Sequence, residues 1–426
     1  MNIKKTKLLR RRGVLIACLT IGAAALWAPT AQTSAHHGGP GGQHGRSGGQ
    51  HGRSGGQHGR PGGHHGAGNG AVYVQSNSEP FNTVLVFNRN HDGTLTAAGS
   101  VMTGGVGQPT GNPPGGIPFI DTAGSVTLSH NGRFLLVVNA GDNTVSSFRV
   151  TGHGLRLANV VPSFGERPAS VTVHHHLVYV LNSDTGSASI SGYRLGGNGH
   201  LTPIPGSVQP TTSPADGLPA QIQFDAKGKV LAVSERFAGG SGDIDTFAIG
   251  HNGAAEPGVA HPSQDVTPYG IAFTHKNVMI VSNEHAPDGI GSSVSSYNVS
   301  HHGAVTPIET EPTNSGAACW NVITKNDKYV LITSPFTLQI NSFRIEHNGQ
   351  LTPVNGDSIV ATAQGVTLDE SLSRNSKYLY VLVDEPTGFA YSQLNSYKVN
   401  GDGTITLLGT TDPFGFGGSS SGTAAW

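Results

Sequence analysis

The sequence has almost none of the cysteine that stabilises many small exported proteins. Two cysteines occur in 426 residues, Cys18 and Cys319. Cys18 lies in an N-terminal stretch that we expect to be removed, so no intramolecular disulfide is possible in the mature chain. The mature chain must therefore be held together by burial of an apolar core, and it is long enough to build one.

Helical periodicity and common catalytic motifs are also missing. No G-x-S-x-G elbow, zinc-binding signature or phosphate-binding loop occurs. After residue 70 the sequence consists of short apolar runs separated by Gly, Asn and Asp, which is typical of β-strands joined by turns. The sequence therefore predicts an all-β protein and offers no local motif that names its chemistry.

Residues 1–35 have the three parts of a secretory signal. MNIKKTKLLRRR is basic, GVLIACLTIGAAALW is an apolar run shorter than a typical membrane span, and APTAQTSA supplies small residues for cleavage. Thr33 and Ala35 suit the −3 and −1 positions, so we expect cleavage after Ala35. The sequence predicts an exported protein (periplasmic, cell-surface or secreted) without a membrane span after removal of the signal.

Residues 36–70 form a low-complexity tract that repeats the unit GGQHGRS. Glycine dominates it and no aliphatic side chain larger than alanine occurs, so we expect it to be disordered. Its seven histidines allow two interpretations, a soluble protonatable spacer or a segment that captures Zn, Ni or Cu. Their even distribution favours the spacer, and we expect no metal or cofactor.

The net charge of the chain conceals an uneven distribution. Nine of the 25 Lys and Arg residues precede residue 71, whereas all 26 Asp and Glu residues follow it, so residues 71–426 carry a net charge of −10. This balance argues against nucleic acid or anionic lipid as a partner. A small-molecule ligand and a monomeric protein are the expectations.

An apolar strand motif recurs seven times after residue 70. A polar strand such as TVSSFRV and then a glycine turn and a further strand such as NGQLTPVN follow each copy, and an additional apolar strand such as SVTLS precedes six of them. The C-terminal SGTAAW would supply the seventh inner strand. A spacing of about 51 residues is typical of propellers. The copies occupy residues 72–77, 134–139, 177–182, 230–235, 278–283, 329–334 and 378–383.

These repeats predict a seven-bladed β-propeller over residues 71–426, with four antiparallel strands per blade. We expect the C-terminal strand to pair with the N-terminal blade, which would close the ring and remove its open edge.

Strand direction places several polar residues on one face of such a ring. The ends of the second strands and the loops that lead to the next inner strand share this face, around the central mouth. Hydrolysis of a lactone needs a group that activates water and a donor that stabilises the oxyanion. We assign Glu235 or Glu284 as the base, with His285 as base or acid.

The same face supplies candidates for substrate binding. Arg167 or Arg236 could bind a substrate carboxylate or phosphate through paired hydrogen bonds. The alternative is that such residues merely end strands and satisfy loop amides. The remaining expected binding residues are Asn139, Asn182, Asn283 and Trp320.

Other polar groups have structural interpretations. His174, His175 and His176 fall in a turn on the opposite face. Asp243 and Asp245 alternate along a strand, and we expect a solvent-facing pair rather than a calcium site. Cys319 is interpreted as a buried thiol near Trp320 rather than a nucleophile.

Several strings resemble the lactonase-type seven-bladed propeller family, which is named for bacterial 6-phosphogluconolactonase and includes fungal carboxymuconate-lactonising enzymes. The strings are RPASVTVHHHLVYVLN, LTPIPGS, LPAQIQFDAKGKVLAVSE, GAACWNVITKNDKYVLITS and NSFRIEHNGQLTP. The resemblance covers residues 71–426 and is strongest to the exported branch of the family. It implies a propeller that hydrolyses or forms lactones without a required metal.

The resemblance carries over to the active residues only in part. Family members use an Arg-His pair at the start of an inner strand, whereas here Arg167 precedes Pro168. Glu235 and Glu284 match the family's glutamate after a second strand, and His285 could replace the missing imidazole. Three hypotheses follow: an exported lactone hydrolase, a non-enzymatic scaffold or ligand-binding propeller, and metal capture by the histidine tract.

Overall fold

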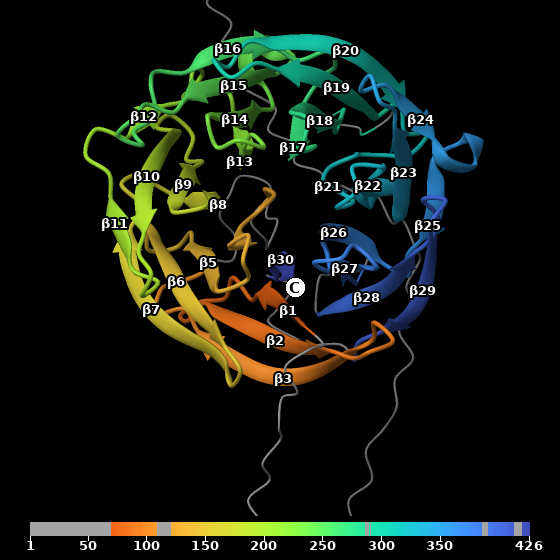
Figure 1. The fold of residues 1–426 in the computed structure, drawn as a ribbon, viewed down its shortest axis with the longest axis horizontal. Coiled ribbons are helices and arrows are strands. Elements are labelled where there is room, and N and C mark those ends of the chain that lie inside the picture. The colour runs from red at the N-terminus through yellow and green to blue at the C-terminus, as the bar shows by residue number, and fades with distance from the viewer. Residues whose placement is uncertain (1–69, 109–120, 286–288, 290, 386–390, 413–419) are drawn as a thin grey trace, which may run out of the picture.

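The computed structural model describes residues 70–108, 121–285, 289, 291–385, 391–412 and 420–426. These residues form seven antiparallel sheets that radiate from a central axis (Figure 1). The predicted all-β, seven-bladed propeller is therefore confirmed. The expected signal peptide and nearly all of the Gly/His-rich tract lie outside the described residues. The helices of the described residues are three single-turn 3-10 helices, η1 (Ala238–Gly240), η2 (Pro335–Thr337) and η3 (Val354–Gly356).

Each blade contributes one inner strand beside the axis and a second strand paired with it. Blade 1 comprises β30, β1, β2 and β3, and blades 2 to 7 follow in chain order. The inner strands are β30 (Ser421–Ala425), β4 (Val126–Leu128), β8 (Pro168–His174), β13 (Pro219–Phe224), β17 (Pro268–Phe273), β21 (Asn321–Ile323) and β26 (Val366–Leu372). The second strands are β1 (Ala71–Gln75), β5 (Phe134–Asn139), β9 (Leu177–Asn182), β14 (Val230–Glu235), β18 (Val278–Asn283), β22 (Tyr329–Ser334) and β27 (Tyr378–Asp384).

Two further strand positions complete each blade. The third strands are β2 (Thr83–Arg89), β6 (Thr144–Thr151), β10 (Ser189–Leu195), β15 (Asp243–Ala248), β19 (Ser293–Val299), β23 (Gln339–Ile345) and β28 (Ser392–Val399). The outer strands are β3 (Leu95–Met102), β7 (Gly154–Pro162), β11 (Leu201–Pro203) with β12 (Gln209–Pro210), β16 (Val259–Pro262), β20 (Val305–Pro312), β24 (Leu351–Pro353) with β25 (Ile359–Thr362), and β29 (Ile405–Thr410).

The ring closes through a sheet that contains both ends of the propeller. β30 pairs antiparallel with β1, with Tyr73 opposite Ala424 and Val74 opposite Thr423. In Figure 1 the C-terminal strand lies beside β1 near the centre of the ring. The predicted closure by SGTAAW is thus confirmed, and it gives the inner edge of β1 a hydrogen-bonding partner.

The second strands are apolar throughout because each sheet is covered on both faces. All six residues of β5, FLLVVN, are buried. Leu136 and Val138 on one face of blade 2 belong to a cluster with Val171 and Val180 of blade 3. A strand with two covered faces does not need the alternation of a half-exposed strand, which explains why its sequence is a continuous apolar run.

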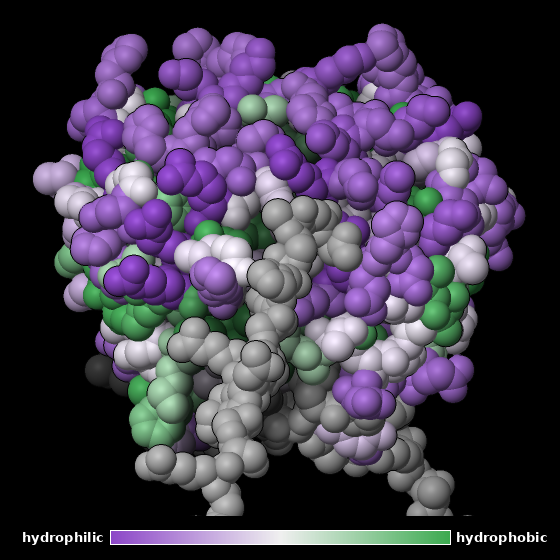
Figure 2. Space-filling model, turned by 60° about the horizontal axis from the view of Figure 1, so that its bottom comes forward, coloured by the Kyte–Doolittle hydropathy of each residue, from purple (hydrophilic) through white to green (hydrophobic). Residues whose placement is uncertain are grey.

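The outer strands are exposed and less regular. β3 has no buried residue, and the outer position of blades 3 and 6 is divided into two short strands. Figure 2 shows mainly hydrophilic side chains on the side of the ring that it presents, with hydrophobic residues in smaller patches. No helix among the described residues is long and apolar enough to cross a membrane.

The loops of the propeller gather on two faces. The mouth face carries the ends of the second strands and the loops to the next blade. The turn face carries the turns between inner and second strands and between third and outer strands. Turns of this face contact each other across blades: the Tyr378 hydroxyl donates to the His91 carbonyl (2.9 Å) and the Tyr329 hydroxyl to the Gly401 carbonyl (3.1 Å).

The turn between β28 and β29 offers a matched test of this packing. Gly403 has φ +90°, and a Cβ there would clash with the Tyr329 ring of blade 6. Gly401 in the same turn has open space around its Cβ position. We expect Gly403→Ala to lower the free energy of unfolding by roughly 1–3 kcal/mol. Gly401→Ala should change it by less than about 0.5 kcal/mol. Urea unfolding checks both, and equal effects would contradict the packing argument.

Candidate functional site

Three of the second strands end in an asparagine whose side chain is held by hydrogen bonds. Asn139 Nδ2 donates to Thr144 Oγ1 (2.9 Å) and Ser146 Oγ (2.8 Å), both on the third strand. Asn283 donates in the same way to the hydroxyls of its own third strand, and Asn182 donates to the Ser163 carbonyl (3.2 Å). All three asparagines are fully buried. The structure thus uses the amides of Asn139 and Asn283 to join strands within a blade, whereas Asn182 joins blade 3 to the loop that follows the outer strand of blade 2.

The residue after the second strand points toward the axis in blades 4 and 5. Arg236 Nη1 lies 2.8 Å from Asp121 Oδ2 and 3.6 Å from Glu284 Oε2. The Tyr269 hydroxyl donates to Asp121 Oδ1 (3.1 Å). Asp121 precedes the inner strand of blade 2, so these contacts join blades 2, 4 and 5 across the axis. We call Asp121, Arg236, Tyr269 and Glu284 the axial cluster.

Trp320 of blade 6 packs against the axial cluster. Its Nε1 donates to the Thr122 carbonyl (3.1 Å). Its ring packs edge-on against the Tyr269 ring, with 5.2 Å between the ring centroids. Cys319 beside it is buried, as the sequence indicated, and burial raises the pKa of its thiol well above the ordinary value. A thiol of this kind is not a nucleophile at neutral pH.

The charges in the axial cluster are set by burial and by the contact between Arg236 and Asp121. Desolvation lowers the pKa of Arg236, but Asp121 and Tyr269 outweigh it and the net shift is upward, so the guanidinium stays charged. Burial raises the pKa of Glu284 to about 8. The 3.6 Å contact with Arg236 does not reverse this shift, because Arg236 is closer to Asp121. Among the described residues, Glu284 Oε2 has no hydrogen-bond partner.

Arg167 lies next to the axial cluster and is half-buried. Its Nε donates to Gln108 Oε1 (3.1 Å) and its Nη1 to Ser183 Oγ (3.1 Å). Burial lowers the pKa of Arg167, Asp121 opposes that change, and Arg236 adds to it. The two guanidinium groups predicted to bind an anion therefore lie close enough to influence one another, with Asp121 acting on both.

Glu235 is not part of the axial cluster. Its Oε2 accepts hydrogen bonds from Thr212 Oγ1 (3.2 Å) and Ser213 N (3.0 Å). Asp245 accepts from Thr212 as well, through Oγ1 (2.5 Å) and N (2.7 Å). Burial and then the charge of Asp245 raise the pKa of Glu235 to about 7. Asp245 is fully buried, so the expectation that Asp243 and Asp245 both face solvent is wrong for Asp245.

His285 is also separate from the axial cluster. Its Nε2 lies 2.8 Å from Asp265 Oδ2, and its side chain is 22% exposed. Asp265 in turn accepts from Ser293 Oγ (2.5 Å). This His–Asp pair is on the mouth face, but the structure gives it no contact with Arg236 or Glu284.

Two features of the site were missed in the sequence. Asp121 and Tyr269 were not among the residues predicted for the site, although Asp121 lies in the loop before β4 and Tyr269 lies near the start of β17. Asp369 and Glu370 lie within β26, and burial raises both of their pKa values, that of Asp369 to about 7. Neither carboxyl oxygen of Glu370 has a hydrogen-bond partner among the described residues. The sequence could have indicated these buried acids, because two consecutive acidic residues interrupt an otherwise apolar inner strand.

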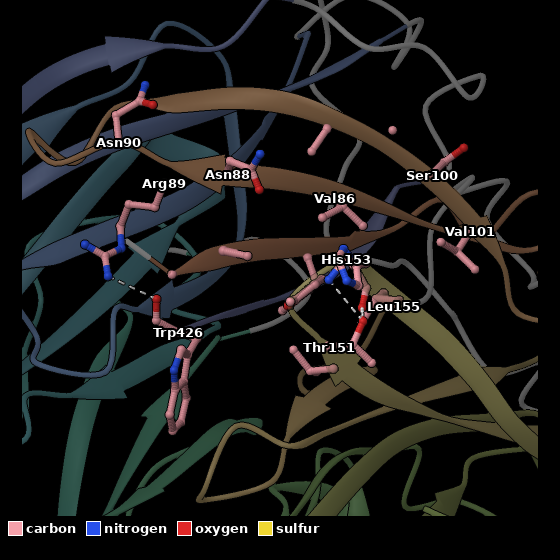
Figure 3. A pocket seen from close by; sticks show the side chains of 18 residues that line it. Val86, Asn88, Arg89, Asn90, Ser100, Val101, Thr151, His153, Leu155 and Trp426 are labelled. Carbon is pink, nitrogen blue, oxygen red and sulfur yellow. Dashed lines mark hydrogen bonds between the residues drawn. The ribbon is translucent and has the colours of Figure 1, made fainter. Parts of the chain in front are cut away.

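A groove of about 480 Å³ lies between blades 1 and 2, away from the axial cluster (Figure 3). Arg89 and Trp426 border one part of it, and Arg89 Nη2 donates to the Trp426 carbonyl (3.3 Å). His153 and Leu155 border the other part. Within the described ranges, no group of three or more His, Cys, Asp or Glu side chains is placed to hold a metal ion.

The fold and the site together define this protein as a seven-bladed propeller with a buried arginine–carboxylate cluster across its axis. Residues 69–212 match the family model described as lactonase, 7-bladed beta-propeller. Together with the structural neighbours below, this match confirms the resemblance to the lactonase-type seven-bladed propeller family. The comparison with curated proteins found no match.

Solved structures with the same fold include proteins named for lactone hydrolysis. A putative 6-phosphogluconolactonase from Bacteroides fragilis has 16% identity and a TM-score of 0.57, covering 85% of this chain and 99% of that one. The periplasmic gluconolactonase PpgL of Pseudomonas aeruginosa has 13% identity and a TM-score of 0.62, covering 84% and 99%. At these identities the similarity shows the fold.

The buried acids predict how stability depends on pH. A carboxyl whose pKa is raised in the folded state keeps its proton at pH values where the unfolded chain has lost it, so rising pH favours unfolding. We expect the free energy of unfolding to fall between about pH 5 and pH 7 through the groups with pKa values of about 7, and up to about pH 8 through Glu284, with a limiting slope of about 1.4 kcal/mol per pH unit for each group. The groups are Glu235, Asp369 and Asp384, with pKa values of about 7, and Glu284, with a pKa of about 8.

Urea unfolding at several pH values measures this slope. Glu284→Gln should make it shallower, because a neutral amide removes one titrating group. Glu256→Gln, which changes an exposed side chain, is the control and should leave it unchanged. Stability that rises from pH 5 to pH 8 would contradict the assignment.

Proposed function

We propose that this propeller hydrolyses a small lactone at its mouth face. The observation that carries the proposal is the axial cluster, which places the buried carboxyl of Glu284, whose pKa burial raises to about 8, 3.6 Å from the charged guanidinium of Arg236. The match of residues 69–212 to the lactonase family supports the reaction class.

The chemistry divides between one acid and two arginines. Ionised Glu284 takes a proton from water, and the resulting hydroxide adds to the lactone carbonyl. Arg236 or Arg167 donates hydrogen bonds to the oxyanion that forms. The ring C–O bond then breaks, the alkoxide takes the proton that Glu284 had removed from water, and a hydroxy acid leaves with Glu284 ionised again. Glu235 is the weaker candidate for the base, because its carboxyl is held by Thr212 and Ser213 within blade 4.

The proposal places this activity outside the cytoplasm. The leader-like residues 1–35 support export, and one structural neighbour is named as a periplasmic gluconolactonase. Sugar phosphates are confined mainly to the cytoplasm, and the chain is acidic after residue 70. We therefore propose an unphosphorylated lactone as the substrate.

The pH profile tests the role of Glu284. Because the base must lose its proton, kcat/KM on the best lactone of a γ- and δ-lactone panel should rise as pH passes about 8. Glu284→Gln should lower kcat/KM by about 100-fold or more and flatten the profile. Glu235→Gln should keep the profile, and exposed Arg194→Gln serves as the control for charge removal. Loss of activity in Glu235→Gln alone would transfer the role of base to Glu235.

A non-catalytic ligand-binding propeller is the second candidate. It is favoured by Pro168, which stands where the family places the histidine after arginine, and by the burial of the axial cluster. Folded protein with no turnover of any lactone, but with a melting temperature raised by hydroxy acids or lactones, would favour this function over hydrolysis.

A further inference from the structure

Histidine is concentrated on the turn face. Of the fourteen histidines after residue 70, twelve lie in turns of this face or at a strand end beside them, and eleven of the twelve are exposed. His261 and His285 are the two that lie elsewhere. The twelve are His91, His130, His153, His174, His175, His176, His200, His251, His275, His301, His302 and His347.

Lysine and arginine follow the same distribution. Fourteen of the sixteen after residue 70 lie in these turns or in the strand ends beside them, whereas Arg167 and Arg236 are at the mouth. Six acids share the turn region: Asp92, Asp225, Glu256, Asp327, Glu346 and Asp402. The net charge of −10 is therefore an average over two unlike faces, and the turn face is cationic even before its histidines gain protons.

Some histidines of the turn face have charged neighbours. His275 Nδ1 lies 2.9 Å from Asp327 Oδ1. Asp92 lies beside His91. Burial lowers the pKa of His174, the charge of His175 adds to this shift, and Asp225 opposes it. His347 faces Lys276 Nζ at 3.0 Å. Among the described residues, most of the exposed histidines have neither an acid nor a cation as a hydrogen-bond or ion-pair partner.

The turn face is broad and receives charge from every blade. Lysine, arginine or histidine occurs in its turns all around the ring, rather than along one stripe. A nucleic acid strand or a peptide would contact a stripe, whereas a plane of anionic headgroups can contact the whole disc at once. Exposed imidazoles in general gain a positive charge below about pH 6.5.

The N-terminal sequence joins the propeller on this face. The Gly70 carbonyl accepts a hydrogen bond from Arg89 N (3.1 Å), and Gly70 borders the groove between blades 1 and 2. Residues 36–69 contain seven histidines and three arginines but no acid. The sequence that leads into the turn face thus has the same charge chemistry as the face itself.

We propose that the turn face docks the protein on an anionic phospholipid surface under mildly acidic conditions and releases it near neutral pH. The charge on the turn face rises as its histidines gain protons, and attraction to phosphate headgroups rises with it. The mouth face, with its acidic residues, is directed away from the bilayer. This proposal is independent of the proposed lactone hydrolysis.

Co-sedimentation with vesicles tests the proposal on the whole chain. We expect at least a tenfold higher partition coefficient at about pH 5.5 than at about pH 7.5 on vesicles that contain one third phosphatidylglycerol. High salt should abolish this binding, and vesicles of phosphatidylcholine alone should not bind. Equal binding at both pH values, or binding to the neutral vesicles, would overturn the proposal.

Variants identify the surface. A variant with His251→Gln, His301→Gln, His302→Gln and His347→Gln should lose most of the gain at acidic pH, whereas His261→Gln should keep it. Circular dichroism confirms that each variant is folded. Unchanged binding by the fourfold variant would overturn the assignment to the turn face. If the protein binds soluble polyphosphate but not vesicles, the ligand of the turn face is a free polyanion, and the proposal of membrane docking is wrong.

Discussion

Antiparallel pairing of β30 with β1 is the constraint on which the other features depend. It places residues near both ends of the propeller in one sheet and closes the ring. In a closed ring, loops from blades that are distant in sequence meet at the axis. Asp121 of blade 2 can therefore contact Arg236 of blade 4 and Tyr269 of blade 5, contacts that an open array of blades would not bring together.

The strands could be predicted from the sequence because burial leaves a strong pattern in it. β5, β9, β14, β18 and β22 have the boundaries that the repeated motif indicated. These strands are covered on both faces, so their apolar runs begin and end where the sheet does. The ends of the outer strands were harder to predict, because many types of side chain are tolerated where a strand is exposed to solvent. In LTPIPGS, proline and glycine divide the outer strand of blade 3.

The site was predictable only to the level of a face. Strand order in the sequence assigns Arg236 and Glu284 to the mouth face, yet the direction of each side chain could not be read from it. Glu235 and Arg236 are neighbours in sequence, but one turns toward Thr212 in its own blade and the other toward Asp121 across the axis. This difference depends on where the strand ends and on the loop that follows it. Glu284 occupies the position in blade 5 that Arg236 occupies in blade 4.

The closing sheet also fixes where the chain leaves the ring. Trp426 N donates to the Ala71 carbonyl (2.9 Å), so the first and last described residues lie side by side on the turn face. Any linker or fusion partner attached through either end would therefore emerge beneath the ring, on the side opposite Glu284. A propeller tethered in this way presents its mouth outward whichever end holds it.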